Sequence, residues 1–331
     1  MGTPRRAFAL SLGAAPFLVR RAPAQRQPSG PAAWPTRAVR LVVPFAAGGS
    51  TDVAARILAE RMGQTLGQPV VVENRAGSGG LIGADTVAKA EPDGYALLMA
   101  TTGLLSIAPH LYPQMPFDPA RDLAPVSLAF ATDLVIAVAA SVPARTLQEF
   151  VLHAKEKPGA ISYASSGAGT TTHAATELFR LAAGLELLHV PYRGSGPAMN
   201  DLVAGNIQLM VDQIASAIGQ INEGRIRALA VTGSGRHPLL PGVPTVAEAG
   251  LPAAQASSWG GIVAPAGTAD PVIGRVNAAV RDAVAQPAVR QRMAGAGADP
   301  AASSPAEFAA FIRAEREKWG RVVREARITV G

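Results

Sequence analysis

Residues 41–56 read LVVPFAAGGSTDVAAR, and this stretch decides the local fold. A short β-branched apolar run over 38–45 is typical of a buried strand, and the glycines that follow it mark a turn. Apolar residues then recur at the spacing of one helix face: Val53, Ile57, Leu58, Met62 and Leu66. The stretch therefore predicts a strand, a glycine-rich loop and a helix, in that order.

The same order repeats along the first part of the chain. A second strand is expected over 69–73, a glycine-rich loop over 74–80, a helix over 81–90 and a third strand over 95–101. Strands that alternate with helices form right-handed βαβ units, so the sequence predicts a parallel sheet.

The alternation restarts after residue 133 and runs to the end of the chain. The expected strands are 134–140, 161–164, 187–190, 207–211, 226–232 and 259–264. The expected helices are 147–155, 171–183, 198–204, 215–221, 271–285, 288–294 and 305–327. No period of 20–50 residues repeats, which excludes solenoids and propellers.

The chain length suggests two α/β lobes. A domain usually takes roughly 100–200 residues, and the chain has 331. Strands near 130–140 and 258–264 are expected to pass between the lobes, which makes a two-crossover hinge protein. The predicted division gives residues 36–133 and 261–331 to the first lobe and residues 134–260 to the second.

Composition and charge exclude several classes of protein. The chain is 48% hydrophobic, which excludes wholesale disorder, and it has no cysteine, which excludes disulfide scaffolds and thiolate catalysis. The net charge of +6 includes four arginines in the first 24 residues; without them Lys+Arg falls from 30 to 26 against 24 acidic residues, leaving +2. No basic run remains elsewhere, so we expect no nucleic-acid partner.

The first 24 residues have the pattern of an export signal. A basic start precedes an apolar run over 7–19 and the small-residue ending Ala22-Pro23-Ala24. That run rises about 20 Å as a helix, too short for a ~30 Å hydrocarbon core. We therefore expect cleavage near Ala24, a flexible leader over 25–35 and a periplasmic protein. Arg5-Arg6 resembles the twin-arginine motif; an ordinary secretory signal with coincidental arginines is the alternative.

Most catalytic signatures are absent from the sequence. It contains no phosphate-loop motif, no HExxH and no G-x-S-x-G. The glycines of segment 77–83 depart from the dinucleotide fingerprint, because the last one comes a residue late. The five histidines form no ligand pair at helical spacing, so we expect no metal, no cofactor and no enzyme. A serine hydrolase that uses Ser166 and His173 stays open as an alternative.

Polar turns follow predicted strands in both lobes. Ser50-Thr51-Asp52 can cap the first helix, and Asp52 can pair with Arg56 four residues later. Residues 165–172 read SSGAGTTT, which is denser in hydroxyls than capping requires. Free amides and hydroxyls at a helix N-terminus form an anion site. Ligands of parallel sheets bind outside the carboxyl ends of the strands, so these turns and Thr101 are expected to line one cleft.

Residues 41–56 also resemble the signature of the Bug family, the periplasmic solute-binding receptors of tripartite tricarboxylate transporters. The likeness spans about residues 36–325 and continues in VENRAGSGG (72–80), PDGY (92–95), ATTG (100–103), YASSGAGT (163–170), HVPYRG (189–194), PAMNDL (197–202) and PGVPT (241–245). Ala46-Ala47 departs from it, because the family usually has a proline before Gly48-Gly49. We expect this departure to loosen the first loop.

The resemblance implies a two-lobed α/β fold of the periplasmic-binding-protein (Venus-flytrap, type II) class, with two crossover strands. Such a receptor closes on a small ligand, commonly a carboxylate, and delivers it to the membrane subunits of the transporter. We expect it to be a monomer. A ligand-sensing module for a membrane histidine kinase is a further alternative.

The resemblance also implies a set of ligand-binding residues. The first-lobe loop would meet the ligand partly through ordered water, the second-lobe loop would hold a carboxylate, and two residues would occupy further cleft positions. In that order they are Phe45, Ala47 and Asp52; Ser166, Thr170 and Thr171; and Thr101 and Asp212. The two aspartates could favour an ammonium-bearing amino acid or could only organise water and loops. The sequence does not decide between an amino acid, an aromatic acid and another organic acid.

Overall fold

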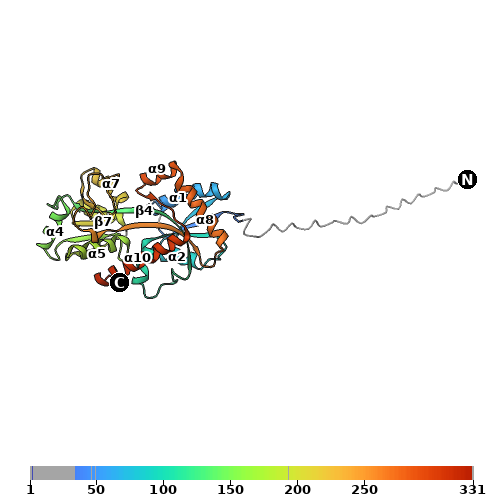
Figure 1. The fold of residues 1–331 in the computed structure, drawn as a ribbon, viewed down its shortest axis with the longest axis horizontal. Helices are drawn as coiled ribbons and strands as arrows, with labels where there is room; N and C mark the ends of the chain where they lie inside the picture. Colours follow the sequence, from blue (N-terminus) through green and yellow to red (C-terminus); the bar gives the residue numbers. More distant parts are fainter. Residues whose placement is uncertain (1, 3–33, 46, 49, 193, 330–331) are drawn as a thin grey trace.

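The computed structural model describes residue 2 and residues 34–329, except residues 46, 49 and 193. Of the predicted signal peptide and leader, only residues 2, 34 and 35 are among them, so both predictions lie outside the described residues (Figure 1). None of the described helices is both long and apolar enough to cross a membrane.

The first lobe has the order of elements that its sequence predicts. β1 (Val39–Val43) leads through the glycine turn into α1 (Ser50–Leu66), and β2 (Val70–Asn74) pairs with β1 in parallel. After α2 (Leu81–Ala88), β3 (Ala96–Thr101) pairs in parallel with the other side of β1. The glycine turn and the segment after β3 therefore lie at one edge of the sheet.

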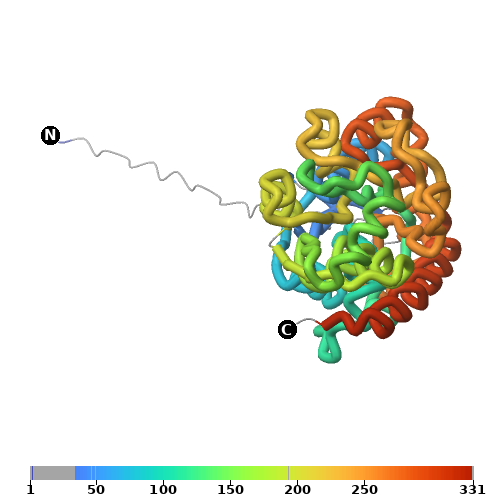
Figure 2. The backbone as a smooth tube through the Cα atoms, turned by 90° about the vertical axis from the view of Figure 1, so that its left-hand side faces the viewer, coloured from blue at the N-terminus to red at the C-terminus, as the bar shows by residue number. Residues whose placement is uncertain are grey.

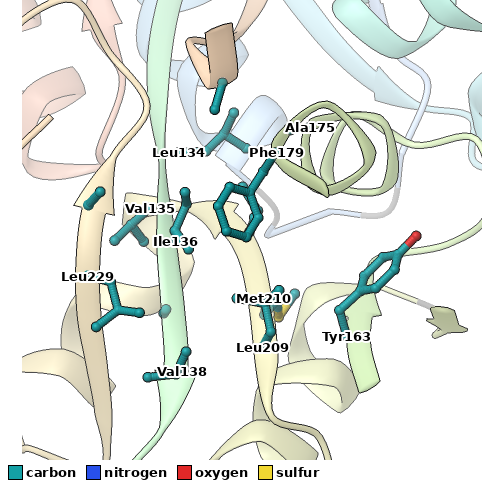
Figure 3. Packing of buried hydrophobic residues seen from close by; sticks show 14 of the residues in the cluster. Leu134, Val135, Ile136, Val138, Tyr163, Ala175, Phe179, Leu209, Met210 and Leu229 are labelled. Atoms are coloured by element: carbon teal, nitrogen blue, oxygen red, sulfur yellow. The ribbon is translucent and has the colours of Figure 1, made fainter. Parts of the chain in front are cut away.

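The second lobe repeats this arrangement. β5 (Ser162–Ser165) pairs in parallel with β6 (Leu188–Pro191) and β7 (Leu209–Gln213). The other elements of this lobe are α4 (Leu147–Lys155), α5 (Thr171–Ala183), α6 (Ser195–Ala204), α7 (Ile214–Asn222), β8 (Ile226–Val231) and the short η4 (Pro252–Ala254). Figure 3 shows the core of this lobe, where Phe179 of α5 faces the side chains of Leu134 and Ile136.

One long strand joins the two lobes. β4 (Leu123–Ala139) pairs with β9 (Ser257–Pro265) through its first part and with β7 and β8 through its second part (Figure 1). All of these pairings are antiparallel, so the predicted parallel sheet is wrong at its centre. The resulting order is β2-β1-β3-β9-β4-β7-β5-β6, and β10 (Asp299–Pro300) also pairs with β4.

The sequence predicted a strand over 134–140 and a crossover near 130–140, but not the first part of β4 from Leu123. Its first part contains Pro125 and two register shifts against β9, so the strand breaks the regular alternation that sequence patterns report. The two crossover strands were nonetheless predicted at the correct places in the chain. The two-lobed fold is thus built on a mixed sheet.

Three helices close the chain: α8 (Asp270–Ala285), α9 (Pro287–Gly295) and α10 (Pro305–Ala326). Figure 2 shows α10, in red, along the outside of the molecule. Phe308 near its start packs in a cluster with Leu98 and Trp259, whereas Trp319 near its end belongs to the core of the second lobe. The division into residues 36–133 with 261–331 and residues 134–260 stays a prediction, and α10 contacts both sides of it.

Candidate ligand-binding site

A cavity of about 210 Å³ lies where the turns of the two lobes face each other. Six of the eight residues predicted to bind ligand line it: Phe45, Asp52, Thr101, Ser166, Thr170 and Thr171. The other two lie outside this lining. Ala47 is exposed in the turn before α1, and Asp212 is buried in β7.

Asp52 organises the first-lobe turn. Its Oδ2 accepts hydrogen bonds from the Gly48 amide at 2.9 Å and from Arg56 Nε at 3.0 Å, and its Oδ1 accepts one from Asn74 Nδ2 at 2.9 Å. Burial alone would raise the pKa of Asp52, but the hydrogen bonds from Arg56, Gly48 and Asn74 together hold it below its ordinary value. The predicted pair with Arg56 is confirmed, and both carboxylate oxygens are engaged by the chain itself.

The second-lobe turn carries a cluster of three hydroxyls at the N-terminus of α5. Ser166 Oγ lies 2.9 Å from Thr172 Oγ1 and 3.2 Å from Thr170 Oγ1, and the two threonine hydroxyls are 3.0 Å apart. Thr170 is also the N-cap residue, because its hydroxyl accepts a hydrogen bond from the His173 amide. No acidic residue lies in the first turn of α5. The positive end of this helix therefore meets the cavity without an internal counter-charge.

Two stacked histidines support the second-lobe turn from the interior. The ring centroids of His173 and His189 are 3.8 Å apart. His173 Nδ1 accepts a hydrogen bond from the Gly169 amide at 3.0 Å, and His189 Nε2 lies 2.7 Å from Ser165 Oγ. Burial, followed by the nearby charge of His189, lowers the pKa of His173 to about 3, so this ring is neutral at physiological pH. Sequence reasoning missed the pair because no local pattern links a helix residue to a strand residue 16 positions later.

The geometry of a serine hydrolase is not formed. Ser166 Oγ bonds to the hydroxyls of Thr170 and Thr172, and His173 Nδ1 is taken by the Gly169 amide. Within the described residues no hydrogen bond joins Ser166 to His173, and no group of three or more His, Asp or Glu side chains could hold a metal ion.

The two lobes touch directly beside the cavity. Ser50 Oγ at the start of α1 donates a hydrogen bond to Gln213 Oε1 at the end of β7, at 2.7 Å. Gly103 begins the π-helical turn η3 (Gly103–Ile107), and a methyl group placed on it would lie 3.8 Å from Thr171 Oγ1 and 4.0 Å from Thr101 Oγ1. Thr101 is only 9% exposed. Neither of these two threonine hydroxyls has a hydrogen-bond partner in the part of the chain that the structure describes.

Asp212 is not part of the cavity lining but accepts a hydrogen bond from Gln213, which is. Its Oδ1 accepts hydrogen bonds from the Gln213 amide at 2.8 Å and from Ser195 Oγ at 3.0 Å. Burial raises the pKa of Asp212 to about 7, and those hydrogen bonds offset the effect only in part. Asp212 is thus linked to the cavity through Gln213, whose side chain accepts the hydrogen bond from Ser50.

The sequence analysis missed most of the apolar wall of the cavity. Besides the predicted Phe45, this wall contains Leu81, Ala108, Tyr112, Phe130 and Trp259. The Trp259 indole donates a hydrogen bond to Glu315 Oε2 of α10 at 3.1 Å, and the Trp319 indole donates to the same oxygen at 2.9 Å. These residues come from elements far apart in the chain, including α2, α3 (Ala108–Leu111), β4 and β9, so no local pattern could have grouped them. The remaining short element, η2 (Ser78–Gly80), contributes Gly79.

Comparison with known proteins agrees with this arrangement. The family model of the tripartite tricarboxylate transporter family receptor, TctC, matches residues 54–328. The chain is 39% identical to protein BugT of Bordetella pertussis over 293 residues, which are 88% of this chain and 90% of BugT. Among solved structures, Rpa4515 of R. palustris with adipate matches with a TM-score of 0.83 and 36% identity, covering 89% of this chain and 99% of that one.

A second solved structure is also similar to this chain over most of its length. The periplasmic binding protein BugD matches with a TM-score of 0.79 and 36% identity, covering 89% of this chain and 99% of that one. The family model covers most of the chain, and BugT matches it over 88% of its length. The chain therefore belongs to the TctC family of tripartite tricarboxylate transporter receptors, the Bug proteins, and is a two-lobed periplasmic-type solute-binding protein rather than an enzyme.

Proposed function

We propose that the protein is a periplasmic receptor that captures a small organic carboxylate between its lobes and delivers it to the membrane subunits of a tripartite transporter. Membership of the family supports both the receptor role and the transporter partner. The adipate in Rpa4515, a relative 36% identical, supports a carboxylate ligand.

The observation that carries this proposal is the set of unpaired donors at the N-terminus of α5. We place the carboxylate against this helix end, where it accepts hydrogen bonds from the hydroxyls of Thr171 and Thr101 and from backbone amides of the turn. Ser166 and Thr170 bond mainly to each other and to Thr172, so they shape the turn. A buried anion is stable only when its oxygens are hydrogen-bonded, which couples binding to closure of the lobes.

The Thr171→Val variant tests this placement. It removes a hydroxyl while keeping the shape of the side chain. The Thr171 hydroxyl forms no hydrogen bond with another of the described residues, so its removal should not disturb the fold. A charge-assisted hydrogen bond contributes roughly 1.5–3 kcal/mol, so the dissociation constant of a carboxylate should rise about ten- to a hundredfold with an unchanged melting temperature. Thr86→Val is the control, because the Thr86 hydroxyl bonds only within α2. Equal affinities of both variants in calorimetry would place the carboxylate elsewhere.

Export is part of the proposal, since a periplasmic receptor must leave the cytoplasm. We place the mature N-terminus near Gln25, which intact-mass measurement of the exported protein tests. Changing both Arg5 and Arg6 to lysine should block export if the signal follows the twin-arginine route. Unchanged export would show that the general secretory route is used.

A further inference from the structure

The arginines of α10 differ from most other arginines of the protein in having no acidic partner. Outside α10, most of the described arginines form ion pairs, as Arg236 does with Glu248 at 2.9 Å. The arginines within α10 are Arg313, Arg316, Arg321 and Arg324. In the part of the chain that the structure describes, none of their side chains forms an ion pair or donates a hydrogen bond. Their charges are therefore available to a molecule outside this chain.

Three of these arginines lie along one side of α10, which runs along the outside of the molecule (Figure 2). At 3.6 residues per turn, Arg313, Arg316 and Arg324 fall within roughly 80° of one another around the helix axis. Gly320 lies between them on the same side, and a Cβ placed on it would be 2.6 Å from His110 Cε1. The ring of His110, from α3, therefore occupies this place, and its Nε2 donates a hydrogen bond to the Arg316 carbonyl at 2.9 Å. We call the three arginines and His110 the arginine stripe.

The arginine stripe has an excess of positive charge. Burial lowers the pKa of His110, and the charges of Arg316 and Arg324 lower it further, although the hydrogen bond to the Arg316 carbonyl opposes them. The exposed acids Glu317 and Glu325 of α10 form no ion pair with any described residue. The other two acids of the helix are hydrogen-bonded within the chain. Four arginines thus stand against two unpaired carboxylates on the outer surface of α10, which suits an acidic partner.

A cavity of about 200 Å³ adjoins the arginine stripe. Arg313 and Arg316 line it together with the apolar residues Leu105, Leu123, Val263 and Ile312. No acidic residue is among the described residues of its lining. A protein segment with acidic and apolar side chains can pair with the arginines and also fill this cavity, whereas lipid head groups on a flat surface use only the charge. The cavity therefore favours a protein segment over a membrane surface.

α10 also connects the arginine stripe to the ligand cavity. Phe308 near its start packs with Trp259, and Trp319 near its end lies in the core of the second lobe. Glu315 Oε2 accepts hydrogen bonds from the indoles of both tryptophans, and Trp259 lines the ligand cavity. A partner bound to the stripe would thus contact the helix that joins both lobes to the cavity wall. This is a suitable position for a partner that receives the ligand.

We infer, on the basis of the proposed function, that the arginine stripe is the docking surface for an acidic segment of the transporter's membrane subunit. Carboxylates of that segment pair with Arg313, Arg316 and Arg324, and an apolar side chain enters the adjoining cavity. The inference assigns a surface outside the ligand cavity and the chemistry of the partner that binds to it.

Photocrosslinking in cells that produce both the receptor and the transporter tests this surface. The crosslinker benzoylphenylalanine replaces Glu317, which is exposed on α10 next to the stripe. Ultraviolet light should then join the receptor to an acidic periplasmic segment of the membrane subunit, identified by mass spectrometry of the crosslinked peptide. Adding both Arg316→Ser and Arg324→Ser should reduce this adduct at least about fivefold. The melting temperature should stay unchanged, because these side chains have no partner among the described residues.

Two further pairs of substitutions separate the position of the charge from its amount. Arg275→Ser with Arg281→Ser is the matched control: both arginines are exposed on α8, neither has an ion pair in the described chain, and the same charge is lost. The adduct should be unchanged in this variant. Arg316→Lys with Arg324→Lys keeps the charge of the stripe and should retain most of the adduct. An equal loss in the α8 control, or no adduct in any variant, would overturn the docking surface.

The partner itself is tested by two other outcomes. Flotation with vesicles of phosphatidylethanolamine and phosphatidylglycerol shows whether the stripe binds lipid. Binding that the two serine substitutions in the stripe abolish, without any protein adduct, would overturn the inference in favour of a membrane surface. An adduct with a membrane protein that is not a transporter subunit would overturn the transporter partner of the proposed function, while the stripe would remain a docking surface. The carboxylate site is independent of all these results, because Thr171→Val tests it by calorimetry.

Discussion

The turn before α1 and the turn before α5 share one design and have different roles. Each joins the end of a buried parallel strand to the start of a helix, and each begins its helix at the cavity. In the first turn Asp52 supplies a buried charge that the chain itself satisfies through Gly48, Arg56 and Asn74. In the second turn the hydrogen bonds are made by neutral groups instead: the Ser166 hydroxyl bonds to that of Thr170, and His173 accepts a hydrogen bond from the Gly169 amide. The first turn of α1 thus carries a negative charge from the chain itself, whereas the first turn of α5 carries none.

Among the substitutions that test this difference between the two turns, the largest effect is expected in the first-lobe turn, on the stability of the protein. Asp52→Asn should lower the free energy of unfolding by about 2–3 kcal/mol, because it removes charged hydrogen bonds from a side chain that is 2% exposed. Ligand affinity of the folded variant should change little. Asp85→Asn is the matched control, since Asp85 forms a partly exposed pair with Lys89 at the same spacing. A large loss of affinity without loss of stability would instead indicate that Asp52 contacts an ammonium group.

The neutral histidine of the second lobe predicts a dependence of stability on pH. The pKa of His173 is about 3 in the folded protein and roughly 6.5 in an unfolded chain. Between these values the unfolded chain binds a proton that the folded protein does not, so stability falls as the pH decreases below about 6.5. Between pH 7 and roughly pH 4.5 the wild type should lose about 2 kcal/mol more than His173→Asn. Urea unfolding at both pH values measures the difference, and equal losses would mean that the ring is charged when folded.

Thr170→Ala should affect stability and affinity together, because Thr170 is both the N-cap of α5 and a member of the hydroxyl cluster. Loss of the cap should cost about 1 kcal/mol, and disorder of the turn should weaken binding. Thr146→Ala is the matched control: Thr146 caps α4 by accepting from the Glu149 amide. It should cost similar stability and leave affinity unchanged. If Thr170→Ala keeps full affinity, the turn does not depend on its cap.

The smallest effect concerns the contact between the two turns. Ser50→Ala removes the hydrogen bond from Ser50 to Gln213 across the lobes. A neutral hydrogen bond contributes about 0.5–1.5 kcal/mol, so affinity should fall by roughly threefold to tenfold, mainly through faster dissociation. Ser162→Ala removes a similar hydrogen bond, from Ser162 to Gln208, within the second lobe. A dissociation rate that changes equally in both variants would argue against a role of the inter-lobe bond in closure.

Much of the candidate site could be predicted because its polar residues lie in short motifs. Thr101, Ser166, Thr170 and Thr171 follow predicted strands and line the cavity as expected. Asp212 was expected only from the family resemblance, and it is absent from the cavity lining, where its neighbour Gln213 lies instead. The structure also revises one role: Thr170 is a cap as much as a donor.

The sequence by itself determined the order of strands and helices and the charge difference between the two turns, because periodicity, glycine turns and the acidity of a first helical turn are local properties. Tertiary structure alone decided the antiparallel pairing of β4 with β9, the stack of His173 on His189 and the apolar wall around Trp259. Each of these joins residues that are distant in the chain. A sequence pattern shows that a face will be buried, but the partner of that face depends on how the whole chain packs.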